Sequence, residues 1–301
     1  MKKHEELLIR SMLFVPAHNE KLMDSASKVV ADMVFLDIED SVQPIENKQV
    51  ARDRVVEYVA QDRFKGRMVF PRVNDRESGE LLRDLMQLTI PGVDGFVYPK
   101  SYTGQDIYFI DKLLTTIEYE KKMPVGTFKL VPLIETAAAV LNAQEICRAS
   151  DRVVAIAFGC EDFMADLEGM HDPMGQSIFT ARAMIAMAAR ANKVIPIDTV
   201  HIRVHDLEDL ERNLIVAKNL GFEGMMALHP KELPLIHQYF SPSMEEIADA
   251  EEQIRLSEAA VKQGRGVAVI GNKFIGPPMV AAAKKTLAKH QLIQDRIAGI
   301  P

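Results

Sequence analysis

Residues 33–40, MVFLDIED, form an uninterrupted apolar run that gives way to acidic residues. Runs of this kind without polar alternation are typical of parallel β-strands that are covered on both faces. The acidic residues then mark the point at which the chain leaves the sheet. Similar apolar runs, each closed by polar residues, occur at 12–15, 68–70, 95–98, 130–134, 153–158, 199–204 and 224–228.

Segments with helical periodicity lie between these runs. They cover residues 48–59, 81–88, 137–148, 179–191 and 207–220. Asp206 can cap the last of these helices and Gly221 can end it. Strand–helix units repeated about eight times predict a (β/α)8 TIM barrel. A doubly wound open sheet is the alternative, but that fold usually has a glycine-rich turn after its first strand, and residues 15–19, VPAHN, contain no glycine.

A further segment follows the eighth unit. A barrel needs no such segment to close, so we expect a barrel over residues 1–240 and a C-terminal extension over 241–301. The extension is predicted to contain helices over 242–261 and 278–290, with a hairpin or loop over 264–275 between them. We expect it to act as a lid or as an oligomer contact.

Composition narrows the class of protein. The chain has 301 residues, of which 48% are hydrophobic and 26% charged, with a net charge of -7. This mixture excludes collagen-like, coiled-coil and disordered chains, and the acidic balance disfavours nucleic-acid partners. The two cysteines are not in a metal-binding spacing, and no apolar run approaches the ~20 residues of a membrane span. We expect a soluble cytoplasmic protein.

Acidic side chains follow several of the predicted strands, at the end of a barrel where reacting groups lie. Carboxylates gathered at one mouth repel each other unless a cation or protons neutralise them. Mg²⁺ accepts one or two carboxylates and fills its other positions with water and substrate oxygens. Glu135 and Asp162 are therefore the predicted metal ligands. The alternative is that the residues at these strand ends only cap the following helices.

Two basic residues also end predicted strands. Arg72 is the natural partner of a substrate carboxylate, because its planar fork donates two hydrogen bonds. It could instead pair with Glu39 or Asp40, and both arrangements can hold together. Lys100 could attract an anion, act as the Schiff-base nucleophile of an aldolase, or form a buried pair with one of the same acids.

Several motifs carry a resemblance to a known family when taken in order. The chain resembles the citrate lyase β-subunit-like proteins of the HpcH/HpaI aldolase superfamily from about residue 10 to about residue 287. The motifs are RS at 10–11, LFVPA at 13–17, DIEDSV at 37–42, RVN at 72–74, PK at 99–100, LIET at 133–136, FGCEDF at 158–163, DTV at 198–200, GFEG at 221–224 and HP at 229–230.

The resemblance implies an activity. It implies a Mg²⁺-dependent carbon–carbon lyase that acts on a 3-hydroxyacyl-CoA of malyl, citramalyl or citryl type. The products would be a 2-oxo acid and an acyl-CoA. It also implies a homo-oligomer, a trimer by family analogy.

The same resemblance assigns roles to residues. Glu135 and Asp162 take the metal-ligand positions, and Arg72 takes the oxo-acid position. Glu39 and Asp40, which can orient Arg72, are predicted as catalytic residues apart from the resemblance. The predicted substrate-binding residues, besides Arg72, are Thr136, Ala137, Gly159, Glu161 and Lys100.

The chain departs from the family at two positions. Gly276 stands where related enzymes carry an aspartate that serves as the acid or base at the acyl-CoA carbon, and Met225 stands where lysine is common. Glycine has no group that can transfer a proton. Two other functions are therefore kept open: Mg²⁺-dependent acyl transfer from acetyl-CoA to a 2-hydroxy acid, and 2-oxo acid binding without catalysis.

Overall fold

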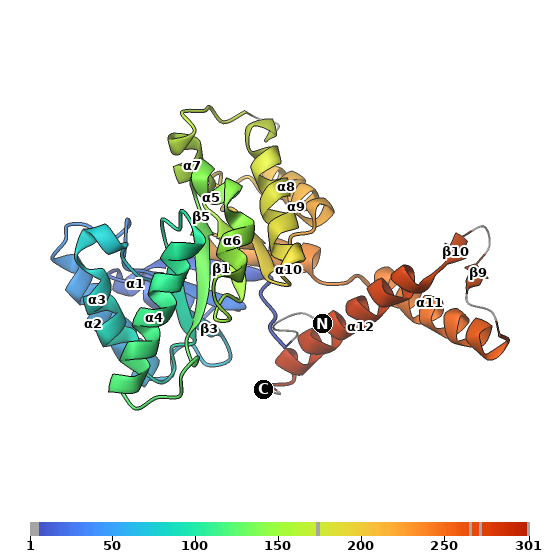
Figure 1. Ribbon diagram of the computed structural model, residues 1–301, viewed down its shortest axis with the longest axis horizontal. Helices are drawn as coiled ribbons and strands as arrows, with labels where there is room; N and C mark the ends of the chain where they lie inside the picture. The colour runs from blue at the N-terminus through green and yellow to red at the C-terminus, as the bar shows by residue number, and fades with distance from the viewer. Residues whose placement is uncertain (1–5, 173–174, 265–266, 271–272, 300–301) are drawn as a thin grey trace. The chain divides into compact units, whose positions relative to one another are not determined.

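The structure is a computed structural model that describes residues 6–172, 175–264, 267–270 and 273–299. The chain divides into two compact units, Met1–Ile236 and His237–Pro301 (Figure 1). Among the described residues, no helix is both long enough and apolar enough to cross a membrane.

The first unit is a closed barrel of parallel strands, which confirms the predicted TIM barrel. The strands pair in chain order, and Ser11 of the first pairs with Met225 of the last to close the barrel. They are β1 (Ser11–Pro16), β2 (Met33–Asp37), β3 (Met68–Arg72), β4 (Gly95–Tyr98), β5 (Lys129–Ile134), β6 (Ala155–Phe158), β7 (Ile195–Asp198) and β8 (Gly224–Ala227).

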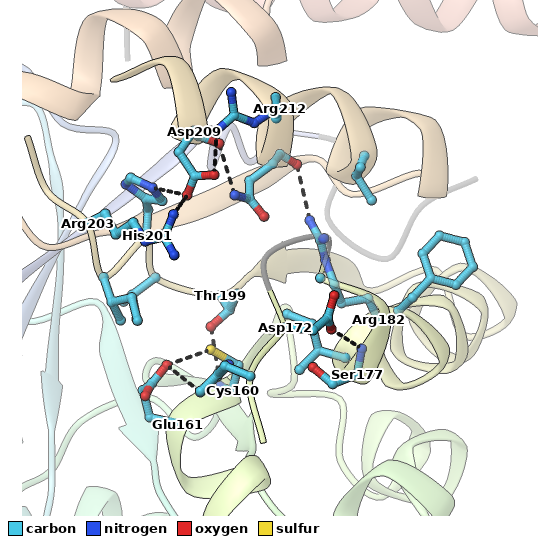
Figure 2. Close-up of a pocket in the computed structure, with 18 of the residues that line it drawn as sticks. Cys160, Glu161, Asp172, Ser177, Arg182, Thr199, His201, Arg203, Asp209 and Arg212 are labelled. Atoms are coloured by element: carbon cyan, nitrogen blue, oxygen red, sulfur yellow. Dashed lines mark hydrogen bonds and ion pairs between the residues drawn. The ribbon is translucent and has the colours of Figure 1, made fainter. Parts of the chain in front are cut away.

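Helices connect the strands. The helix predicted over 207–220 is present as α9 (Leu207–Leu220): the Asp206 side chain accepts a hydrogen bond from the Asp209 N–H, and Gly221 ends the helix in the left-handed conformation. Helix α9 packs beside α8 (Gln176–Ala191), and the two helices border a cavity (Figure 2). The other elements are α1 (Glu20–Ala26), α2 (Asn47–Ala60), η1 (Arg76–Ser78), α3 (Leu81–Leu88), α4 (Gly104–Glu120), α5 (Ala137–Leu141), α6 (Ala143–Arg148), α7 (Cys160–Asp166), η2 (Pro230–Glu232) and α10 (Leu233–Phe240).

Two predicted elements were placed wrongly. The seventh strand is β7, and the segment 199–204 follows it. All four residues of β7 are buried, whereas Ile202 of the predicted strand is 52% exposed, because this segment has already left the barrel. The helix predicted over 137–148 is two helices, α5 and α6, that meet at Asn142. The Asn142 side chain donates to the carbonyl of Tyr102, which lies 40 residues earlier in the chain, just before α4.

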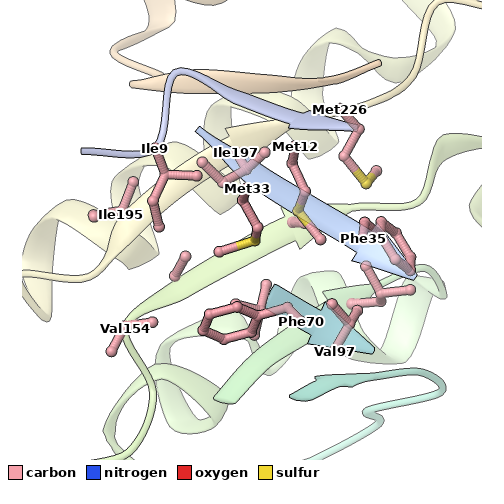
Figure 3. Close-up of a cluster of buried hydrophobic side chains, with 14 residues drawn as sticks. Ile9, Met12, Met33, Phe35, Phe70, Val97, Val154, Ile195, Ile197 and Met226 are labelled. Carbon is pink, nitrogen blue, oxygen red and sulfur yellow. The ribbon is translucent and has the colours of Figure 1, made fainter. Parts of the chain in front are cut away.

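The centre of the barrel is filled by side chains from most of its strands. Met12, Met33, Phe70 and Val97 come from β1, β2, β3 and β4, and Figure 3 shows them directed into the same interior. On β6 the inward residues Ala155 and Ala157 are small, which leaves room for the larger side chains opposite. This packed core fixes the strand ends that carry the polar residues.

The described residues of the second unit form the end of α10, two further helices and a hairpin. The further elements are α11 (Met244–Lys262), β9 (Ala268–Ile270), β10 (Lys273–Ile275) and α12 (Pro277–Ile297). The helices pack on each other, and Ala268 and Ile275 of the antiparallel hairpin pack against Ala260 of α11. Gly276 lies just before α12. Residues 266, 271 and 272 of the tail segment predicted from the family lie outside the described residues. A role as lid or oligomer contact stays a prediction.

The start of β8 yields a test of barrel closure. A Cβ atom on Gly224 would lie 2.1 Å from the Ile9 carbonyl oxygen and 2.8 Å from that of Arg10. Gly224→Ala should therefore lower the free energy of unfolding by about 2 kcal/mol or more, measured by urea denaturation. Gly126→Ala is the control, because a Cβ there meets nothing within 4 Å. It should cost only about 1 kcal/mol, from its left-handed backbone. An equal loss in both variants would contradict the close approach.

Candidate active site

Arg72 forms the centre of a buried charge cluster at the carboxyl ends of β2 and β3. The parallel register places Asp37 directly beside it. Arg72 Nε donates to Asp37 Oδ1 at 2.5 Å, and its Nη1 lies 3.0 Å from Glu39 Oε2. Asp40 lies farther away, at 3.9 Å, with a side chain that is 58% exposed. The predicted pairing of Arg72 with these acids is thus present, and Asp37 is its shortest contact.

Asp37 had no predicted role. Its side chain also accepts hydrogen bonds from the Glu39 N–H and from the N–H and hydroxyl of Ser41. Burial alone would raise the pKa of Asp37, but Arg72 and these donors outweigh it and hold that pKa below its ordinary value. Asp37 is therefore an anion that anchors Arg72. The pairing of two adjacent strand ends was the signal that could have identified it.

Lys100 joins this cluster to Glu135. Its main-chain N–H donates to Glu135 Oε1 at 2.5 Å, and its Nζ lies 2.8 Å from Asp75 and 3.2 Å from Glu39. It does so with a left-handed backbone, at φ 49°, which is uncommon for a residue with a side chain. Burial lowers the pKa of Lys100, but Asp75 and Glu39 outweigh it and raise that pKa. A Schiff-base nucleophile needs a lowered pKa, so this environment favours a permanent cation.

The two predicted metal ligands lie at one mouth. Glu135 is only 3% exposed, whereas Asp162 faces solvent. Burial, with repulsion from Asp162 and Asp40, raises the pKa of Glu135 to about 7, and the opposing effects of the Lys100 N–H and Arg72 do not offset this rise. Burial also raises the pKa of Asp162, and Asp40 adds to the rise. The negative charge of nearby acids therefore contributes to the raised pKa of each carboxylate, as expected for acids around one mouth.

The carboxylate oxygens of Glu135 and Asp162 have the chemistry that a small hard cation prefers. A Cβ atom at Gly159 would lie 3.0 Å from Glu135 Oε2, so glycine keeps that oxygen accessible. The residues that the structure describes contain no group of three or more His, Cys, Asp or Glu that could hold a metal. Two carboxylates with water and substrate oxygens are the ligand set that Mg²⁺ commonly uses. Glu135 and Asp162 are thus suited to hold Mg²⁺ together with water or substrate oxygens, and not to enclose the ion by themselves.

The remaining predicted residues surround the first turns of α5 and α7. Thr136 caps α5 by accepting from the Ala139 N–H. The Ala137 N–H, predicted to bind a substrate carboxylate, instead donates to Asp166 at 2.7 Å. Gly159 lies at the start of α7, whose first N–H groups, including that of Glu161, lack acceptors within the helix. The first turn of α7 therefore has more main-chain N–H groups available to bind an anion than the first turn of α5 has.

A cavity of about 360 Å³ adjoins α7. Figure 2 shows Cys160, Glu161 and Thr199 on one side of it, with His201 and Arg203 on another. Its residues include His201, which lies 3.0 Å from Asp209 and 3.4 Å from Glu232. Burial lowers the pKa of His201, but the two carboxylates outweigh it and raise that pKa. Sequence reasoning singled out Glu161 of its lining residues but not the cavity itself, because most of the others come from segments interpreted as helices and a strand.

Comparison with known proteins agrees with this geometry. The family model described as HpcH/HpaI aldolase/citrate lyase matches residues 10–230. The chain is 31% identical to citrate lyase subunit beta of Leuconostoc mesenteroides subsp. cremoris, over 94% of both chains. It is 28% identical to the (3S)-malyl-CoA thioesterase of Cereibacter sphaeroides, over 96% of this chain and 97% of that protein.

One solved structure is similar over nearly the whole chain. It is the protein CitE from Mycobacterium tuberculosis in complex with magnesium, acetoacetate and coenzyme A. The two chains are 25% identical, with a TM-score of 0.73, covering 95% of this chain and 99% of that one.

The raised pKa of Glu135 predicts how stability depends on pH without metal. Between its ordinary pKa of 4.5 and about 7, the folded protein retains a proton that the unfolded chain has lost. Stability therefore falls as pH rises through this window, on the order of 3 kcal/mol from this group. Glu135→Gln removes that loss. In EDTA, its stability advantage over the wild type should grow from about pH 5 to about pH 8, measured by denaturant unfolding. A constant difference would show that Glu135 ionises normally.

Proposed function

We propose a reaction from the premise that the chain belongs to the HpcH/HpaI aldolase/citrate lyase family and is therefore a lyase-type enzyme. The proposed reaction is the Mg²⁺-dependent cleavage of a 3-hydroxyacyl-CoA of malyl, citramalyl or citryl type. The products are a 2-oxo acid and an acyl-CoA. The observation that carries the proposal is the position of Glu135 and Asp162 at the same mouth as the buried guanidinium of Arg72.

The metal ligands of the proposal are Glu135 and Asp162. Mg²⁺, when bound, polarises substrate oxygens and stabilises the negative charge that develops on them. The magnesium in the similar protein CitE supports this assignment. Glu135 has one oxygen fixed by the Lys100 N–H and the other beside Gly159, so its orientation is set before any ligand arrives.

Arg72 binds the carboxylate of the hydroxy-acid part. Asp37 pairs with its Nε and Glu39 with its Nη1, and these two ion pairs fix the orientation of the guanidinium. The rings of Phe35 and Phe14 lie 5.4 and 5.7 Å from its carbon, which limits water around the charge. A preorganised cation in such a setting stabilises a developing anion more than water can. The first turn of α7, with Gly159 and Glu161, contributes main-chain N–H groups.

Cleavage requires two proton transfers. The hydroxyl proton leaves, the bond between the hydroxyl carbon and the acyl α-carbon breaks, and its electron pair passes to the thioester as an enolate, which then takes up a proton. Glu39 is the group that we assign to the first transfer, because it lies beside Arg72 and burial raises its pKa to about 7. Gly276 contributes to neither transfer.

We also place the enzyme in the cytoplasm as a homotrimer, with residues 241–301 as its lid or oligomer contact. This part of the proposal is independent of the reaction assigned to the barrel.

A second candidate is favoured by Gly276 and by the similarity to (3S)-malyl-CoA thioesterase. In it, the same cluster supports attack on the thioester carbonyl, by water or by a 2-hydroxy acid, and no carbon–carbon bond is cleaved. Such chemistry needs no acid at the acyl carbon, so glycine at 276 would not impair it. Binding of a 2-oxo acid without turnover is the third outcome.

The lyase assignment can be tested with purified protein. Malyl-, citramalyl- or citryl-CoA should release a 2-oxo acid with Mg²⁺ and none with EDTA, measured with a coupled dehydrogenase or by mass spectrometry.

Arg72→Lys should lower kcat/KM at least about 100-fold, because a point charge cannot replace the bidentate fork. Glu135→Gln and Asp162→Asn should weaken activation by Mg²⁺. Release of 2-oxo acid in EDTA would contradict the metal assignment.

Product analysis separates the two candidates. The lyase gives equal amounts of 2-oxo acid and acyl-CoA and no free thiol. Hydrolysis or acyl transfer gives free CoA in the same amount as hydroxy acid or its ester, and no 2-oxo acid. We expect the first pattern, measured by thiol titration alongside mass spectrometry. Free thiol without 2-oxo acid would establish the second candidate.

A further inference from the structure

Lys48 is a buried charge outside the cluster described above. It lies in the first turn of α2 and is only 7% exposed. Its Nζ donates to the main-chain carbonyls of Ile38, at 3.2 Å, and Glu39, at 3.1 Å, and to the side-chain oxygen of Asn74. An ammonium has three N–H donors, and each of these finds an acceptor. Its contacts are therefore directed at the loop after β2.

Asn74 extends the network to the loop after β3. Its Nδ2 donates to Asp84 at 2.7 Å and to the Ile38 carbonyl at 3.3 Å, and its main-chain N–H donates to Asp84. Asp84 is in turn paired with Arg52 of α2, at 2.8 Å. The loops that carry Glu39 and follow Arg72 are thus tied to each other and to α2.

The Glu39 side chain depends on this main-chain support. Its two oxygens are held by ion pairs with Arg72, at 3.0 Å, and Lys100, at 3.2 Å. The N–H of Glu39 donates to Asp37, and its carbonyl accepts from Lys48 and from the Val42 N–H, each at 3.1 Å. Without Lys48, the Glu39 carbonyl would keep only the Val42 N–H, and the Ile38 carbonyl only the weaker contact with Asn74 at 3.3 Å.

We infer that Lys48 is a positioning residue: by holding the carbonyls of Ile38 and Glu39, it sets the carboxylate of Glu39 against the Arg72 guanidinium. This inference rests on the proposed function for its kinetic readout. A misplacement of about 1 Å from a distant mutation can reduce a rate about 100-fold. The effect should fall on kcat, since Lys48 is buried and does not meet the substrate.

Lys121 offers a matched control. Its Nζ also donates to two main-chain carbonyls, those of Met86 and Thr89, but it ties α4 to the end of α3 and touches none of the site residues. Lys48→Met should lower kcat about 10- to 100-fold with KM changed less than about threefold. Lys121→Met should lower the unfolding midpoint without changing kcat. Lys48→Arg, which keeps donors in place, should recover part of the rate.

A double-mutant cycle tests the route through Glu39. If Lys48 acts by placing Glu39, Lys48→Met combined with Glu39→Gln should be no slower than Glu39→Gln alone. Multiplicative losses would overturn the inference, as would a wild-type kcat in Lys48→Met. If Lys48→Met does not fold, Lys48→Gln, which keeps a donor, replaces it in the cycle.

The two proposals fail in distinguishable ways. If the wild type cleaves no thioester, the proposed function fails, and the inference is then decided by crystal structures of the wild type and Lys48→Met. An unchanged distance between Glu39 Oε2 and Arg72 Nη1 would overturn it. If the wild type is active and the cycle is multiplicative, only the positioning role fails.

Discussion

The pairing of Arg72 with Asp37 is the constraint around which this site is arranged. A guanidinium that is 7% exposed is stable only with a compensating charge, and the parallel register of β2 and β3 places an aspartate directly beside it. With Asp37 satisfied by Ser41 and Glu39, the arginine keeps a fixed orientation toward the mouth. Glu39 and Lys100 then complete a chain of alternating charges. Strand register, which the core determines, thus decides where the guanidinium of Arg72 points.

Charge interactions at Glu135 and Asp162 differ from those at Asp37, because repulsion and burial outweigh attraction. Arg72 and Lys100 are shared with Asp37, Glu39 and Asp75, so their stabilisation of Glu135 and Asp162 is outweighed by burial and by repulsion from the neighbouring acids. Such a pair is unfavourable until a cation or protons arrive. The fold therefore carries a local cost at this point, which the packed barrel elsewhere must offset.

The sequence predicted the barrel well because parallel strands buried on both faces give continuous apolar runs. It failed at β7, where Pro196 interrupts the apolar signal and the alternating segment after it imitates a strand. It identified Arg72, Glu39, Glu135 and Lys100 because strand ends converge in a barrel, and the structure brings these four together. It could not find Asp37 as an anchor, Asp166 as the acceptor of the Ala137 N–H, or the ties from Lys48. These depend on register and on contacts between distant helices, which no local pattern records.

Lys100 combines two tasks in one strained residue. Its main chain serves Glu135 while its side chain serves Glu39, and both depend on the same left-handed turn. A shift of that turn would move both carboxylates at once, so a single backbone position links the orientation of Glu135 to that of Glu39.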